Sequence, residues 1–154
     1  MAERVSASIT IGGSLTLTQY GRLCELVIAE GLCIEWDGRL FEAGDHTSGD
    51  PLSLFAHEVA YGSFHELEAW CGDNHLPFAR WAGAYSGQWG ARRVVFLGQG
   101  QPIYYPADED DCLVIDEIKV RELGSIEAIL AYFETAETPI PQLIIGGAGD
   151  VRDR

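Results

Sequence analysis

The segment Gly62-Ser-Phe-His-Glu-Leu-Glu-Ala-Trp-Cys-Gly-Asp-Asn-His-Leu-Pro-Phe78 returns 62 positions later as Gly124-Ser-Ile-Glu-Ala-Ile-Leu-Ala-Tyr-Phe-Glu-Thr-Ala-Glu-Thr-Pro-Ile140. The glycine, the serine, one alanine and the proline are identical in the two copies, and most large apolar residues align with apolar residues. Similarity at a fixed spacing indicates a supersecondary unit that is used more than once. In each copy the apolar residues have helical spacing, which predicts an amphipathic helix after the serine.

A third helix start lies near the beginning of the chain. Thr16-Leu-Thr-Gln19, like Ser63-Phe-His-Glu66, fits the capping box, in which a hydroxyl accepts from the third helical amide and the Glu or Gln side chain reaches back. Ser125 opens the last helix without the reciprocal acidic residue. We therefore expect three helices, at about 17–30, 64–75 and 126–137.

Extended runs flank each of these helices. Before the helices lie 8–11, 53–60 and 113–120, and after them lie 32–36, 76–81 and 142–145. This order predicts a strand–helix–strand unit used three times. Two further runs, 92–97 and 101–105, are joined by Gly98-Gln-Gly100 and predict a hairpin.

The pattern as a whole predicts an α+β fold. Many strands with three helices favour helices on one face of a mixed or mostly antiparallel sheet over a doubly wound parallel sheet. The 154 residues correspond to one domain, which we expect to span 1–146, with a disordered tail at 147–154.

The composition bears on the class of partner. The formal net charge is −14, from 24 acidic and 10 basic residues, so we expect no direct nucleic-acid binding, because the surface repels phosphate. No apolar stretch approaches the roughly 20 residues of a membrane span, and no secretory signal is recognisable, so we expect a cytoplasmic protein without membrane contact. The four cysteines lack metal-site spacing and are predicted to be reduced and buried, with no metal or cofactor.

The loop 80–93 is the predicted binding site. Aromatic residues alternate there with glycine, and three arginines flank them, a combination that suits a planar or anionic ligand or the side chain of a protein partner. The alternative is that Trp81 and Trp89 pack into the core while the glycines turn the chain. The candidate binding residues are Arg80, Trp81, Tyr85, Trp89, Arg92 and Arg93.

The histidines suggest an enzyme as an alternative. His46, His57 and His65 each neighbour a carboxylate within 45–75, so an acid–base pair of a small hydrolase-like enzyme would form if these side chains converged. No HExxH spacing is present, and the residues around Ser86 do not form a GxSxG elbow. We therefore predict no catalytic residue and no metal ligand.

The motifs 76–81, 93–96 and 124–133, together with Tyr85-x-Gly-x-Trp89, resemble those of a group of short bacterial proteins of uncharacterised activity, some of them carried on mobile elements. The similarity covers about 62–140. It implies an accessory or host-interaction role and supplies no catalytic residue.

The leading hypothesis is a non-enzymatic interaction module that binds a protein partner or a small ligand through the loop 80–93. The alternatives are an acidic DNA mimic or host-interaction protein of a mobile element, and the hydrolase-like enzyme. A structural role as a homodimer joined along an edge strand is also open.

Overall fold

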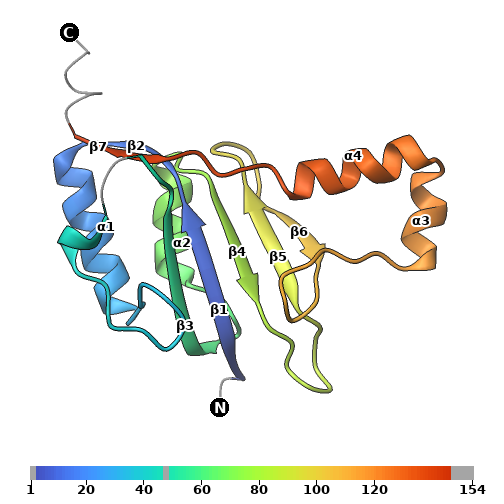
Figure 1. Ribbon diagram of the computed structural model, residues 1–154, viewed down its shortest axis with the longest axis horizontal. Helices are drawn as coiled ribbons and strands as arrows, with labels where there is room; N and C mark the ends of the chain where they lie inside the picture. The colour runs from blue at the N-terminus through green and yellow to red at the C-terminus, as the bar shows by residue number, and fades with distance from the viewer. Residues whose placement is uncertain (1–2, 47–48, 147–154) are drawn as a thin grey trace, which may run out of the picture.

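The computed structural model describes residues 3–46 and 49–146, which form an α+β fold (Figure 1). Its main sheet has the order β3-β1-β4-β5-β6, and every neighbouring pair is antiparallel. A separate parallel pair joins β2 to β7. The strands are β1 (Arg4–Ile11), β2 (Gly13–Leu15), β3 (Leu52–Ala60), β4 (Phe78–Ala82), β5 (Arg92–Phe96), β6 (Ile103–Pro106) and β7 (Leu143–Ile145). The predicted hairpin is confirmed as β5 and β6.

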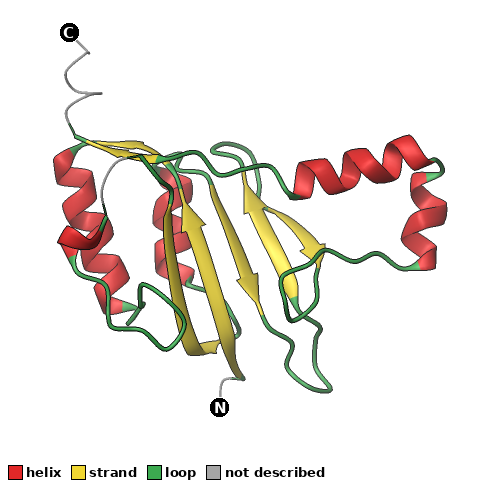
Figure 2. Ribbon diagram, in the orientation of Figure 1, coloured by secondary structure: helices red, strands yellow, loops and turns green. Residues whose placement is uncertain are grey.

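Helices α1 (Leu17–Ala29) and α2 (His65–Asp73) cover one face of the sheet (Figure 2). The capping box at the start of α1 is confirmed, because Thr16 and Gln19 exchange both hydrogen bonds, at 2.8 and 3.1 Å. The predicted box at the start of α2 is wrong. There the amide of Phe64 donates to the carboxylate of Glu68 at 2.8 Å, so a glutamate from the next turn caps the helix.

The expectation of three helices on one face is wrong. Within the described residues there are four α-helices, and α3 (Glu117–Leu123) and α4 (Ile126–Ala136) extend beyond the β6 edge (Figure 1). The run 113–120, predicted as a strand, contains the start of α3. Asp116 caps that helix by accepting from the amide of Lys119 at 2.9 Å, and Gly124 ends it with a φ of 83°.

The threefold strand–helix–strand unit is also wrong in detail. It is complete only at β3–α2–β4, because α4 follows a helix and the segment after α1 is irregular. In that segment the predicted strand 32–36 forms only isolated bridges, from Cys33 to Leu40 and Phe55. A short 3-10 helix, Ala43–Asp45, follows it. The predicted tail at 147–154 lies outside the described residues.

Strand alternation gives the sheet two different faces. Cross-strand partners point the same way, so the face under α1 and α2 carries Ile9, Arg80 and Val94, and we call it the helix-covered face. The opposite face, which we call the open face, carries Ser8, Phe55, Trp81, Arg93 and Tyr105. The main core lies on the helix-covered face.

Candidate functional site

The six predicted binding residues do not form one site. Arg80 and Trp81 are consecutive in β4, and Arg92 and Arg93 are consecutive in β5, so the pleat places one member of each pair on each face. Trp81 and Arg93 lie on the open face. Arg80 and Arg92 lie on the helix-covered face, where Arg80 is buried and ion-paired with Glu68.

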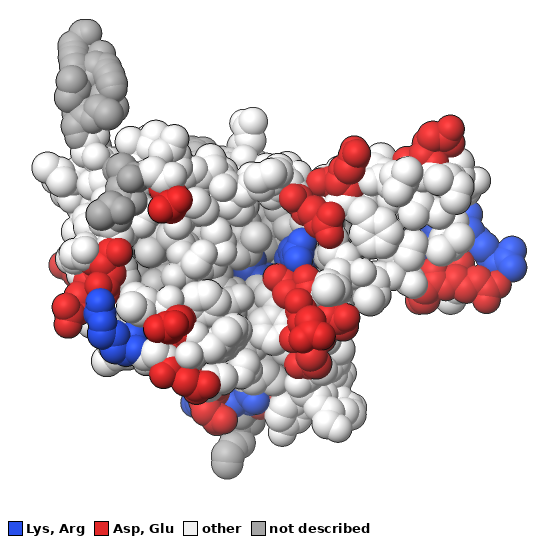
Figure 3. Space-filling model, in the orientation of Figure 1, with Lys and Arg blue, Asp and Glu red and all other residues white. Residues whose placement is uncertain are grey.

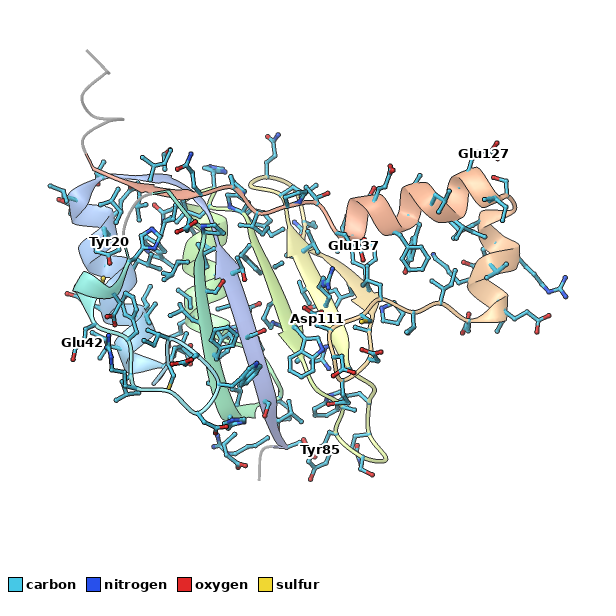
Figure 4. All side chains as sticks on the ribbon, viewed as in Figure 1. Tyr20, Glu42, Tyr85, Asp111, Glu127 and Glu137 are labelled. Atoms are coloured by element: carbon cyan, nitrogen blue, oxygen red, sulfur yellow. The ribbon has the colours of Figure 1, made fainter. Side chains whose placement is uncertain are left out.

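The β4–β5 connection carries Tyr85 and Trp89. Their rings stack with centroids 5.3 Å apart, and the guanidinium of Arg92 lies 5.4 Å from the centre of the Trp89 ring. Both aromatic rings are half-buried against the main core. Tyr85 lies beyond the lower end of the sheet in the view of Figure 4. The sequence left open whether the two indoles are exposed or packed in the core. Trp81 is buried, and Trp89 is partly exposed.

An aromatic groove lies on the open face. The ring of Trp36 contacts Phe55, His57 and Trp81, with centroid separations of 5.0, 5.2 and 6.1 Å. These residues line a hollow of about 520 Å³, into which Ser6 and Ser8 also face. Trp36 is 40 % exposed, so its indole is accessible from the solvent although it packs on three other rings. We call this hollow the aromatic groove.

The acidic turn 108–111 forms one wall of the aromatic groove. The indole of Trp81 donates to the carbonyl of Asp108 at 2.9 Å, and the carboxylate of Glu109 accepts from the amide of Ala84 at 2.9 Å. Burial raises the pKa of Asp111, and the adjacent Arg93 guanidinium opposes that rise. Figure 3 shows these acids as one red group over the sheet, separate from other acidic groups. Hydrogen bonds therefore hold the turn at both ends, at Asp108 by the indole of Trp81 and at Asp111 by the guanidinium of Arg93.

His57 links a serine to an aspartate at the edge of the groove. Ser6 Oγ lies 2.6 Å from His57 Nδ1, and Asp37 Oδ1 lies 3.1 Å from His57 Nε2. A hydroxyl, an imidazole and a carboxylate in series are the components of a serine nucleophile with its base. Here His57 and Asp37 are both exposed, so water surrounds the arrangement.

The other histidines do not join His57. His46 Nε2 contacts the carbonyl of Leu143 at 3.0 Å, His75 Nδ1 contacts the carbonyl of Gly98 at 3.1 Å, and His65 is exposed on α2. The carboxylate of Asp45 is held by Arg39, not by the neighbouring His46. Within 3–46 and 49–146, no group of three or more His, Cys, Asp or Glu side chains is placed to hold a metal ion.

No protein-family model matches this chain, and comparison with curated proteins and with solved structures gave no match either. The resemblance to short bacterial proteins therefore stays a prediction. In the part of the chain that the structure describes, no helix combines the length and the apolar character needed to cross a bilayer.

Residues that we did not predict complete the groove. Trp36, Phe55 and Ser6 line the groove and come from three separated segments, while Asp37 contacts His57 at its edge, and only the tertiary fold brings them together. One signal was present in the sequence. Alternation along the predicted strand 76–81 already assigns Arg80 and Trp81 to opposite faces, which argues against a single site for both.

Proposed function

We propose that this protein is a non-enzymatic binding module whose aromatic groove takes a lysine- or arginine-bearing segment of a protein partner. The observation that supports it best is the exposed indole of Trp36, which packs edge-on against Trp81 in the hollow that the acidic turn also lines. Of the residues predicted from the sequence, Trp81 contributes directly, while Arg93 contributes by anchoring Asp111.

The chemistry of the groove favours a cation. Aromatic faces attract ammonium and guanidinium groups, and the carboxylates of Glu109 and Asp110 stand at the same hollow. The net charge of −14 steers cationic partners toward the protein in general. The volume of about 520 Å³ lies within the range of roughly 300–1,000 Å³ typical of ligand pockets.

Binding of a short lysine- and arginine-rich peptide, measured by calorimetry at two salt concentrations, tests the proposal. Trp36→Ala leaves the charge unchanged and removes the exposed ring, so we expect about tenfold weaker binding, the factor for a cation–π contact of about 1.4 kcal/mol. Tyr104→Ala removes a ring that is even more exposed, at 62 %, and lies outside the groove, so this variant should bind as the wild type does.

A second pair of variants distinguishes the effect on peptide binding of charge at the groove from that of the overall charge of the protein. Asp110→Asn and Asp73→Asn remove the same charge from two exposed positions, of which only Asp110 lines the groove. We expect Asp110→Asn to weaken peptide binding more than Asp73→Asn does. Equal effects of the two, together with a silent Trp36→Ala, would mean that the peptide binds to diffuse negative charge and that the groove is not the site.

Hydrolysis is a second candidate function, because Ser6, His57 and Asp37 form one hydrogen-bonded series at the groove. Its test is turnover of activated esters such as p-nitrophenyl acetate. A hydrolase would lose activity in Ser6→Ala and His57→Gln alike, whereas background ester cleavage by an exposed imidazole would survive Ser6→Ala. The exposure of Asp37 weakens this candidate. Water screens its carboxylate, which therefore does little to orient the imidazole or to stabilise its protonated form.

The remaining expectations stay predictions. On the face shown in Figure 3 the acidic side chains form separate groups, an arrangement that suits a local cation site better than a duplex-like track. The homodimer would use β3 or β6, which are the edge strands of the main sheet. A cytoplasmic location, a host-interaction role and the absence of direct nucleic-acid binding are proposed on the sequence alone.

A further inference from the structure

Arg80 is a buried cation on the helix-covered face. It is 2 % exposed, and among the described residues it alone is charged or polar and fully buried. Its Nε and Nη2 donate to the carboxylate of Glu68 at 2.8 and 3.3 Å. The same carboxylate accepts from the amide of Phe64 at 2.8 Å, so Glu68 is fixed from two sides.

One nitrogen of this guanidinium has no partner. Arg80 Nη1 is sealed from solvent and makes no hydrogen bond. Because Glu68 takes the edge formed by Nε and Nη2, Nη1 lies on the opposite side of the planar group. A buried donor left unpaired is costly, and native proteins satisfy the great majority of such groups, so this one requires an explanation.

A hollow of about 390 Å³ lies beside Arg80, between α2 and the β5–β6 hairpin. Arg80, His65 and Gln101 contribute polar groups to its lining, and Ala69, Phe78 and Phe96 contribute apolar ones. The hollow is separate from the aromatic groove, because the two lie on opposite faces of the sheet. The hollow thus has mainly apolar walls, with the cationic side chain of Arg80 at its boundary.

A second guanidinium lies on the same face of the sheet as Arg80. Arg92 lies two residues from the cross-strand partner of Arg80 and on the same face. Burial lowers the pKa of Arg92, and the charge of Arg80 lowers it further. Within the lining of the hollow, the carboxylate of Glu68 pairs with one edge of the Arg80 guanidinium and leaves Nη1 without an acceptor.

We infer that this hollow binds a small carboxylate with an apolar body, whose carboxylate accepts from Nη1 of Arg80 after the side chains that cover this nitrogen move aside. A planar carboxylate matches the guanidinium geometry, and apolar walls favour an aromatic or aliphatic remainder. A phosphate dianion fits less well, because its second charge would lie near Glu68 without compensation. The site is independent of the proposed cation-binding groove, so either proposal can fail without the other.

Titration with benzoate, followed by amide and arginine side-chain NMR, tests this inference. We expect saturable shifts at Arg80 Nε and at the amides of 63–69, 100–101 and 103–104, with a millimolar dissociation constant. Benzyl alcohol has the same ring without the charge, and inorganic phosphate has the charge without the ring. Both should bind at least tenfold more weakly than benzoate.

A matched pair of helix variants locates the site. Ala69→Leu places a larger side chain at the hollow, whereas Ala131→Leu makes the same change at an exposed position of α4. We expect Ala69→Leu to weaken benzoate binding at least tenfold and Ala131→Leu to leave it unchanged. Arg80→Lys keeps the charge but lacks Nη1, and should also lose binding. If Arg80→Lys does not fold, the comparison of Ala69→Leu with Ala131→Leu still tests the inference.

Four results would overturn the inference. The absence of any saturable shift would show that benzoate does not bind. Equal binding of benzyl alcohol would show that the hollow selects only for an apolar ring. Wild-type affinity in Ala69→Leu would place the ligand elsewhere. Tighter binding of phosphate than of benzoate would overturn the assignment of an apolar carboxylate.

Discussion

Arg93 holds the carboxylate of Asp111 through two nitrogens, since Nε and Nη2 both donate to Oδ1, at 3.0 and 2.9 Å. Nη2 also donates to the carbonyl of Asp111 at 2.7 Å, and Nη1 donates to the carbonyl of Ala136 at 3.1 Å. One side chain of β5 thus fixes both the acidic turn and the C-terminal end of α4. Asp111 lies beside β5 and β6 in Figure 4.

Removing this anchor should destabilise the protein. Arg93→Met keeps much of the side-chain length and deletes every hydrogen bond, so we expect a loss of about 2–3 kcal/mol in the free energy of unfolding. Urea denaturation measures it. Arg22→Met is the matched control, because Arg22 pairs with Glu25 on the exposed surface of α1 and should cost less than about 1 kcal/mol. Equal losses would show that Arg93 anchors nothing.

Asp45 should make the stability of the protein depend on pH in a defined direction. The hydrogen bond from Arg39 and the one from the amide of Glu42 lower the pKa of Asp45 below its ordinary value of 3.8. A lowered pKa in the folded state stabilises the protein above the unfolded pKa, and this contribution disappears as the pH falls through the folded pKa. Asp45→Asn should therefore be less stable than the wild type at neutral pH, and the difference should shrink below pH 3.8.

Urea denaturation across a pH series checks this expectation. Arg39→Met should reproduce the loss at neutral pH, and the double variant should lose less than the sum of the two single variants, because the residues share one interaction. A difference between wild type and Asp45→Asn that grows toward acid would contradict the assigned direction of the pKa shift.

Local signals in the sequence predicted the elements well. The capping box at Thr16 gave the start of α1, Ser125 gave the start of α4, and alternating runs gave the strands of the main sheet. These signals succeed because capping and strand patterning involve residues close in sequence. The start of α3 was missed although Asp116 and Gly124 mark its ends, since the apolar run between 113 and 120 resembles a strand.

The arrangement of the elements was harder to predict. A stripe such as Ile126, Ile129 and Phe133 has the same spacing whether it packs against a sheet or extends past its edge. The groove depends on Trp36 reaching Phe55 and Trp81, which lie on two other segments. Such contacts are set by tertiary packing, and nothing in the local pattern of any one segment specifies them.

The cysteines should differ strongly in reactivity. Burial raises the pKa of Cys71 to about 12, whereas Cys112, which was expected to be buried, is exposed. Since the thiolate is the reactive form, we expect Cys112 to react first with Ellman's reagent and Cys71 to react only as the protein unfolds. Stopped-flow absorbance follows both phases. Cys112→Ser should remove the fastest phase, and its persistence in that variant would contradict the assignment.

The two helices that gave the strongest repeat signal should differ in their contribution to stability. Leu67 and Ile126 both lie on the apolar stripe of their helix, yet Leu67 of α2 is 0 % exposed whereas Ile126 of α4 is 69 % exposed. Leu67→Ala removes packing from the main core and should cost about 2–5 kcal/mol in the free energy of unfolding. Ile126→Ala should cost less than about 1 kcal/mol, because the side chain is largely in solvent already and alanine favours the helix.

Urea denaturation of the two variants, with α-helical circular dichroism as a second probe, checks this difference. If α4 lay on the sheet as the repeat pattern predicts, both substitutions would open a cavity and the two losses would be similar. A loss for Ile126→Ala close to that for Leu67→Ala would therefore contradict the position of α4 beyond the β6 edge. A small loss for Ile126→Ala beside a large one for Leu67→Ala would confirm that similar apolar stripes lie in different environments in this chain.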